Sequence, residues 1–322
     1  MKKLLILLFI IPLILSLRLN AQELFPATEP ASTLPKGLLG ARFMYEGFKE
    51  VPSERKKHWS AIRLMYGVTG KLTLQITGTA SNHHPKKFPA DFRNYLVNHH
   101  QKVFIPDPYI PDGFNIYAKY RWLSIDDKQK HLRFAFYGEF AKAYTPHSEA
   151  EPLLMGGDNT GVGGGLIITQ LYKRFAVSFT YGLAFPFEYV DKEQDITFKS
   201  GNAINYNLSF GYRIYPAQYS GYDNLNINLY VEFINKQYEK AYMTAQGKYV
   251  DFDFIQYEDQ YVYKSLQENK YSEIRPSLQF IFNSNTRVDV GVAHPFINQS
   301  YLHFYPMYFI NVQKYFFRKT KK

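Results

Sequence analysis

The chain has 322 residues, of which 46% are hydrophobic and 18% are aromatic, and its formal net charge at pH 7 is +10. Its mean hydropathy of -0.32 excludes a protein built from several transmembrane helices, because each such helix needs about 20 mostly apolar residues and would raise the mean well above zero. The absence of cysteine excludes a thiol nucleophile, a thiolate metal site and disulfide bonds.

The first residues have the pattern of a secretory signal peptide. Lys2 and Lys3 precede an apolar run over residues 4–17, and Arg18 and Ala21 follow it. This order of basic, apolar and small residues predicts cleavage after Ala21. We therefore expect a signal peptide over residues 1–21 and one mature domain over residues 22–322, whose net charge falls to +7 because three cations leave. The alternative is an uncleaved anchor helix.

The remaining chain is dominated by alternation of apolar and polar residues, the period of a half-exposed β-strand. In residues 131–140, for example, Leu132, Phe134 and Phe136 alternate with Arg133 and Tyr137. The same pattern predicts twelve strands, near residues 38–47, 59–67, 71–80, 114–123, 131–142, 161–171, 174–186, 202–213, 223–234, 271–283, 287–296 and 304–317.

The connections between these segments alternate in length. Short turns, such as residues 68–70 and 172–173, are followed by long loops at 48–58, 81–113, 143–160, 187–201 and 235–270. Together with an even strand count and a signal peptide, this alternation is typical of the transmembrane barrels of bacterial outer membranes. We predict an all-β fold, a transmembrane antiparallel up-and-down β-barrel of about 12 strands with both termini in the periplasm. A soluble β-sandwich, which also alternates apolar and polar residues, is the alternative.

Several motifs carry a resemblance to a known family. They are "LPKG" (34–37), "YGVTGKLTLQI" (66–76), "AKYRWL" (118–123) and "GGDNTGVGGGLIITQLYKRFAVSFTYGL" (156–183). Residues 37–187 resemble outer-membrane proteins catalogued as meta-pathway phenol-degradation or transporter-like. The resemblance implies uptake or efflux of small, often hydrophobic or aromatic compounds. The last segment, "FINVQKYFF" (309–317), is similar to the final strand that the outer-membrane assembly machinery recognises.

The parity that turns apolar side chains toward lipid turns charged ones toward the lumen. Seven cations and three anions on this parity predict a positive bias that favours anionic solutes. The alternative is that these charges pair across a narrow, plugged barrel. The predicted lumen-lining residues are Arg63, Lys71, Lys119, Arg121, Arg133, Glu139, Arg213, Glu232, Arg275 and Asp289.

Four histidines in the loop at 81–113 are candidate metal ligands, because neutral imidazoles suit Zn, Cu or Ni. Adjacent residues of an extended chain point in opposite directions, so an exposed polar loop is the alternative and we assign no cofactor. The four are His83, His84, His99 and His100.

Two other motifs suggest chemistry only superficially. His58 and Ser60 share one strand face, as a base and a nucleophile would, but no third group that would orient His58 is visible. The glycine run at 161–165 is followed by a strand-like segment, so it lacks the helix that a phosphate-binding loop needs. Its glycines instead favour a bend or close packing against a lumen plug.

We expect an outer-membrane channel or transporter that passes small solutes passively, gated by the loops at 81–113 and 235–270, and not an enzyme. Its expected partners are outer-membrane lipid, a small-molecule solute and the assembly machinery, with no nucleic acid. The first alternative is a surface-binding or structural barrel that presents its loops. The second is a lipid-modifying enzyme that uses His58 and Ser60.

Overall fold

The structure is a computed structural model that describes residues 25–49, 56–83, 108–144, 151–192, 195–218, 224–250, 266–298, 300 and 304–316. The expected signal peptide lies outside these residues. Among the residues described, no helix has the length and apolar character needed to cross a membrane.

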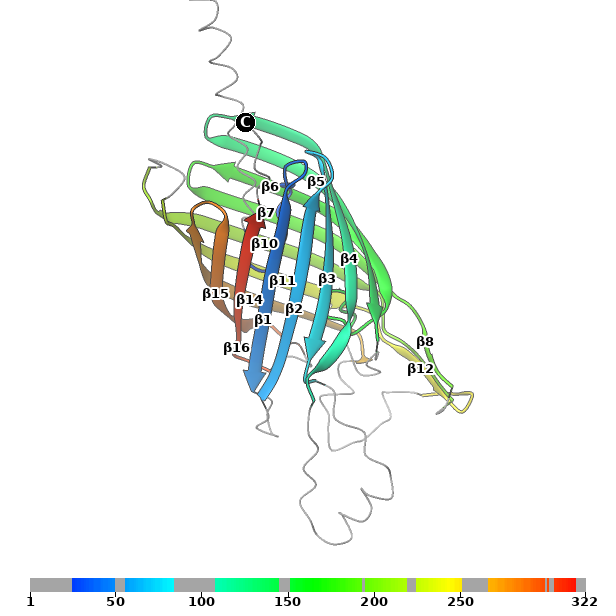
Figure 1. The fold of residues 1–322 in the computed structure, drawn as a ribbon. Helices are drawn as coiled ribbons and strands as arrows, with labels where there is room; N and C mark the ends of the chain where they lie inside the picture. Colours follow the sequence, from blue (N-terminus) through cyan, green and yellow to red (C-terminus); the bar gives the residue numbers. More distant parts are fainter. Residues whose placement is uncertain are drawn as a thin grey trace, which may run out of the picture.

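Twelve antiparallel strands close into a barrel, which confirms the predicted fold class (Figure 1). Each strand pairs with the next barrel strand along the chain, and the last pairs with the first, from Leu39 opposite Phe316 to Gly47 opposite Tyr308. The barrel strands are β1 (Leu39–Lys49), β2 (Lys56–Gly67), β3 (Leu72–Ser81), β4 (Ile110–Asp127), β5 (Lys130–Ala143), β6 (Gly161–Tyr172), β7 (Phe175–Pro186), β10 (Ala203–Tyr215), β11 (Asn226–Tyr238), β14 (Asn269–Phe282), β15 (Thr286–Ile297) and β16 (Met307–Phe316).

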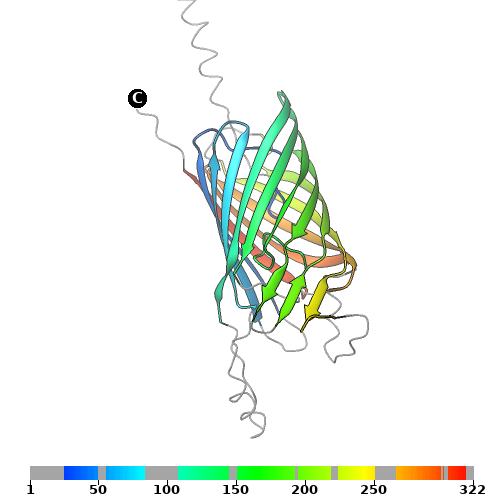
Figure 2. The ribbon, with the colours of Figure 1, turned by 90° about the vertical axis from the view of Figure 1, so that its right-hand side faces the viewer.

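The two ends of the barrel differ. Short hairpins join β4 to β5, β6 to β7 and β14 to β15 at the upper end in Figures 1 and 2, which we call the short-turn end. The opposite, long-loop end carries the long connections that the sequence predicts. In an outer-membrane barrel the short turns face the periplasm and the long loops face outward.

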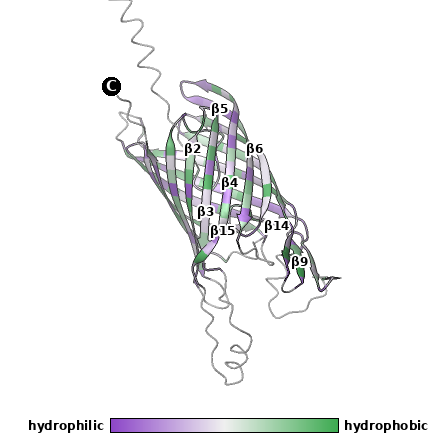
Figure 3. Cartoon of the chain, turned by 45° about the vertical axis from the view of Figure 1, so that its right-hand side comes forward, coloured by the Kyte–Doolittle hydropathy of each residue, from purple (hydrophilic) through white to green (hydrophobic). Residues whose placement is uncertain are grey.

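Burial alternates along the strands as the parity predicts. In β16, Tyr308 and Ile310 are exposed while Phe309 and Asn311 are buried. Figure 3 shows the resulting mixture of hydrophobic and hydrophilic bands along each strand. The exposed positions are largely aliphatic and aromatic, so the outer face is an apolar surface suited to lipid, whereas the inner face is rich in polar and charged side chains.

A small second sheet extends the long-loop end. It consists of β8 (Tyr189–Asp191), β9 (Ile196–Lys199), β12 (Tyr242–Ala245) and β13 (Lys248–Tyr249), in the order β13-β12-β9-β8. Phe198, Ala241 and Leu266 form its buried cluster. The described part of the predicted gating loop at 235–270 thus includes β12 and β13 of this sheet.

Candidate functional site

A segment directly before β1 lies inside the barrel. We call residues 25–34 the lumen segment. Phe25 and Ala31 are fully buried, and the Phe25 ring packs edge-on against Tyr230 of the inner wall with ring centroids 5.4 Å apart. Ala31 packs against Ala135 and Ile167. The segment has no alternating pattern, so the strand period that located the barrel does not reveal it.

Glu29 anchors the lumen segment by charge. One carboxylate oxygen lies 2.7 Å from Arg63 Nη1 and the other lies 2.8 Å from Lys119 Nζ, while Gln75 Nε2 donates a hydrogen bond at 3.2 Å. Burial by itself would raise the pKa of Glu29, but the two cations outweigh burial and lower the pKa from 4.5 to about 2. Glu29 is therefore ionised at neutral pH.

Glu232 holds the backbone of the same segment. Its carboxylate accepts hydrogen bonds from the Ala27 amide at 2.8 Å, the Thr28 amide at 2.9 Å and the Thr28 hydroxyl at 2.8 Å. The Thr28 hydroxyl oxygen is also 2.8 Å from Ser209 Oγ. A carboxylate that accepts three hydrogen bonds in a buried site is a strong and directional anchor.

The lumen segment is also bonded to the wall nearer the short-turn end. The Ala31 amide donates to Thr169 Oγ1 and the Leu34 amide donates to Thr73 Oγ1, both at 2.8 Å. Arg133 Nη1 donates to Ser32 Oγ at 2.8 Å. These contacts to strands on several sides of the barrel hold the segment inside the lumen.

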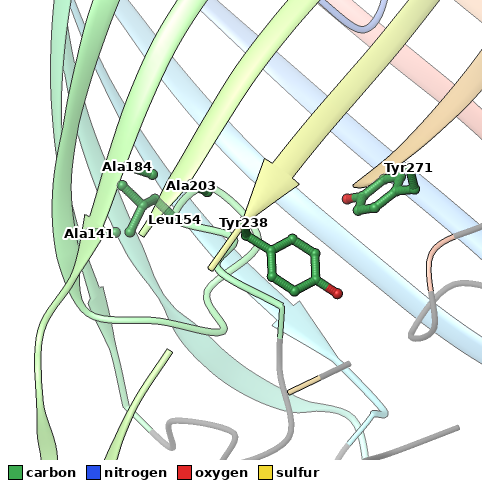
Figure 4. Packing of buried hydrophobic residues seen from close by; sticks show 6 residues of the cluster. All are labelled: Ala141, Leu154, Ala184, Ala203, Tyr238 and Tyr271. Atoms are coloured by element: carbon green, nitrogen blue, oxygen red, sulfur yellow. The ribbon is translucent and has the colours of Figure 1, made fainter. Parts of the chain in front are cut away.

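A second segment narrows the lumen toward the long-loop end. Leu154, in the connection between β5 and β6, packs into a patch of small side chains formed by Ala141, Ala184 and Ala203 (Figure 4). A Cβ on Gly163 would lie 3.0 Å from Leu154 Cδ1, so glycine at this position gives Leu154 its space. This contact is the close packing that the glycine-rich sequence favours.

Polar contacts hold the same connection. Lys236 Nζ donates to the Pro152 carbonyl at 3.0 Å, and Trp59 Nε1 donates to the Gly156 carbonyl at 3.0 Å. Residues 152–156 are thus attached to the wall on β11 and on β2.

A cavity of about 400 Å³ lies between the lumen segment and residues 152–156. Tyr117 and Tyr137 stack on its wall, with ring centroids 5.2 Å apart. Arg275 also borders it, with Nη1 at 2.8 Å from Glu46 and Nη2 at 2.9 Å from Glu273. Binding pockets for small molecules are typically of this size and combine aromatic walls with a few polar groups.

The ten residues predicted to line the lumen differ in how far their side chains are buried. Arg63, Lys119, Glu232 and Asp289 are buried, and Glu139 and Arg275 border the cavity. The half-buried residues are Arg121, Arg133 and Arg213, and Lys71 is exposed beside the β2–β3 turn. Their part in a solute path stays a prediction.

Pairing reduces the charge excess that the sequence suggests. Asp289 lies 3.5 Å from Arg42 and 3.1 Å from Arg287, and Arg133 lies 3.1 Å from Asp126. The sequence count omitted two cations, Arg42 and Arg287, and four anions. The omitted anions, which outnumber the omitted cations, are Asp126, Glu29, Glu46 and Glu273. The pairs favour the alternative in which inner charges neutralise one another across a plugged lumen.

The histidine hypothesis can be followed only at His83, which borders the cavity. His84, His99 and His100 lie outside the described residues, as do parts of both predicted gating loops. Within the described part of the chain, no group of three or more His, Cys, Asp or Glu side chains is arranged to hold a metal ion.

His58 and Ser60 contact tyrosines. His58 Nδ1 lies 2.6 Å from the Tyr45 hydroxyl, and the Tyr109 hydroxyl donates to Ser60 Oγ. Among the described residues no carboxylate is bonded to His58, so the orienting group that a catalytic triad needs is not found there.

No family model and no curated protein matches the chain. Among solved structures, it is similar to an outer membrane channel from Pseudomonas putida F1, with 12% identity, a TM-score of 0.57, and coverage of 91% of this chain and 100% of that chain. It also matches the NanC porin at 9% identity and a TM-score of 0.40, covering 87% of this chain and 99% of that chain. At these identities the first similarity shows a shared fold, that of outer-membrane β-barrels.

Proposed function

We propose that this chain is an outer-membrane channel for the passive passage of small solutes, and that the lumen segment is its movable plug. The observation that carries the proposal is the placement of residues 25–34 inside a closed barrel beside a cavity of about 400 Å³. No nucleotide motif is present in the sequence, and an outer membrane sustains no proton-motive force. Movement of solute would therefore follow its concentration gradient.

The cavity supports a small solute that combines a ring with polar groups. Tyr117, Tyr137 and Trp59 offer aromatic faces, while the Arg275 ion pairs offer hydrogen bonds. This agrees with the small, hydrophobic or aromatic compounds implied by the family resemblance.

A reversible lock of the plug tests the channel function. The chain has no cysteine, and Thr28 and Ser209 touch through their hydroxyls, so Thr28→Cys with Ser209→Cys places two thiols side by side. We expect the oxidised protein in a planar bilayer to conduct poorly and the reduced protein to recover conductance, while Thr28→Cys alone responds to neither treatment. Equal conductance in both redox states would show that the lumen segment is not on the path.

A surface-binding barrel is the second candidate. The ion-paired lumen and the small sheet beyond the long-loop end favour it, since that sheet exposes Tyr242 and Tyr249 with ring centroids 5.8 Å apart. The test is conductance in a planar bilayer of the folded wild type and of a folded variant lacking residues 22–34. If neither conducts, the surface-binding barrel is favoured over the channel.

A further inference from the structure

At the long-loop end, one strand of the barrel wall is shorter than its two neighbours. β16 begins at Met307, opposite Ala293, and its next residue, Tyr308, lies opposite Gly47. Its neighbours continue further, β15 to Ile297 and β1 to Lys49. Beyond Met307, the described residues place no strand between β15 and β1. Strands lie about 4.8 Å apart in a sheet, so β15 and β1 are about 10 Å apart where the β16 ladder has ended; we call this place the gap.

Two side chains lie across this gap. The Phe304 ring stacks on Phe48 with centroids 6.1 Å apart, and the Tyr305 hydroxyl donates to Glu273. Phe48, Glu273 and Met307 border the cavity, so the gap leads directly into it. Within the described residues, the contacts across this place are made by side chains and not by a strand ladder. Side chains can change rotamer without breaking a ladder.

The sheet beside the gap is also weakened. Pairing of β14 with β15 is interrupted at Arg275 and Pro276, and a bulge follows between Ser272 and Glu273. Proline has no amide hydrogen to donate to a neighbouring strand, which explains the interruption. The end of β15 is therefore held by fewer hydrogen bonds than the centre of the wall.

The outside of the gap is apolar. Phe296 and Ile297 at the end of β15 are 56% and 55% exposed, and Tyr308 at the start of β16 is 61% exposed. The Phe296 ring packs against Phe233 on the outer face with centroids 5.0 Å apart. Exposed aromatic rings near the end of an outer-membrane barrel face the membrane–water interface, where aromatic side chains are enriched.

We propose that the gap between β15 and β1, on the long-loop side of Met307, is a lateral portal. Through it, a neutral solute with an aromatic ring passes between the cavity and the leaflet at the long-loop end. Phe304 and Tyr305 are its stopper. The portal deepens the channel function proposed above and rests on it. Ionised solutes would keep to the lumen axis, because entering hydrocarbon costs a charge its hydration.

A disulfide across the stopper tests the portal. The variant Phe48→Cys with Phe304→Cys is compared, oxidised and reduced, with Thr286→Cys with Lys314→Cys, which links β15 to β16 at the short-turn end. Two quantities are measured: the uptake of N-phenyl-1-naphthylamine, a neutral aromatic dye, by intact bacteria that carry the protein, and the single-channel conductance of the purified protein.

Oxidation of the Phe48–Phe304 pair should reduce dye uptake to that of cells without the protein and leave conductance unchanged, with reductant restoring uptake. The control pair should change neither quantity. Phe304→Ala should speed dye uptake without any oxidation, which keeps the test independent of disulfide geometry.

Uptake that persists in the oxidised protein, or conductance that falls together with uptake, would overturn the portal while leaving the channel intact. A wild type that passes neither dye nor current would instead refute the channel function itself.

Discussion

Replacing Glu29 by Gln removes the charge that holds the lumen segment between Arg63 and Lys119 while preserving side-chain size. The pKa of Glu29 lies near 2 in place of 4.5, which corresponds to about 3 kcal/mol in favour of the ionised, docked state. Loss of one partner from a buried ion pair costs roughly 3–5 kcal/mol, and the Glu29 side chain is 15% exposed, so the lower end applies. A loss of about 3 kcal/mol shifts the docking equilibrium about a hundredfold.

Single-channel recording of the purified protein measures this shift as open probability. We expect Glu29→Gln to open far more often than the wild type, and to do so with greater anion preference, because Arg63 and Lys119 then face the lumen without their counter-ion. Glu139→Gln is the matched control, since Glu139 also borders the cavity but bonds Asn115 and not the lumen segment. Equal open probability and reversal potential in the wild type and both variants would refute the assignment of residues 25–34 as a plug.

Three further outcomes follow from particular contacts. Acidification should weaken docking of the lumen segment progressively between pH 4.5 and about 2, because the pKa of docked Glu29 is about 2 while an undocked carboxyl protonates near 4.5. The stabilisation is complete above pH 4.5 and is lost as the pH falls through this window. An open probability that changes with pH only above 4.5 would contradict the ion-pair assignment. Glu232→Gln leaves the Ala27 and Thr28 donors one carbonyl oxygen in place of two carboxylate oxygens, so docking should weaken by about 1–3 kcal/mol, and a variant as closed as the wild type would argue against this anchor. Gly165→Val should prevent barrel formation, seen as loss of the compact, heat-sensitive band on a detergent gel, because a Cβ there would lie 2.0 Å from the Tyr181 carbonyl oxygen; Gly78→Val, whose Cβ would meet nothing within 4 Å, should fold.

The barrel itself was predictable because its signals are local. Each wall strand must place alternate side chains in lipid and in the lumen. This requirement produces an alternation of apolar and polar residues that can be recognised within each segment of about ten residues. The predicted strand at 161–171, for example, is observed as Gly161–Tyr172. Boundaries moved where pairing outlasts the apolar pattern: β11 runs to Tyr238 because its polar last residues pair with Asn269 to Tyr271 of β14.

The plug was not predictable in the same way, because what holds it is long-range. Glu29 forms ion pairs with Lys119 and Arg63, which are remote along the chain. No periodicity in residues 25–34 indicates that this segment lies inside the barrel. Besides the glycine run at 161–165, the charges gave an indirect sign. Seven inward cations against three anions is a costly imbalance in a narrow lumen, and such an imbalance indicates that further anions lie inside. Glu29, Glu46 and Glu273 were those anions.

The pairing of β1 with β16 has a consequence for the order of assembly. The barrel becomes a closed ring only when β16 meets β1, from Leu39 opposite Phe316 to Gly47 opposite Tyr308. The segment that precedes β1 is bonded to strands all around the interior of that ring. β16 follows every other described strand in the chain and yet encloses a segment that precedes all of them. Closure of the wall and enclosure of the lumen segment therefore depend on one event, the pairing of β16 with β1.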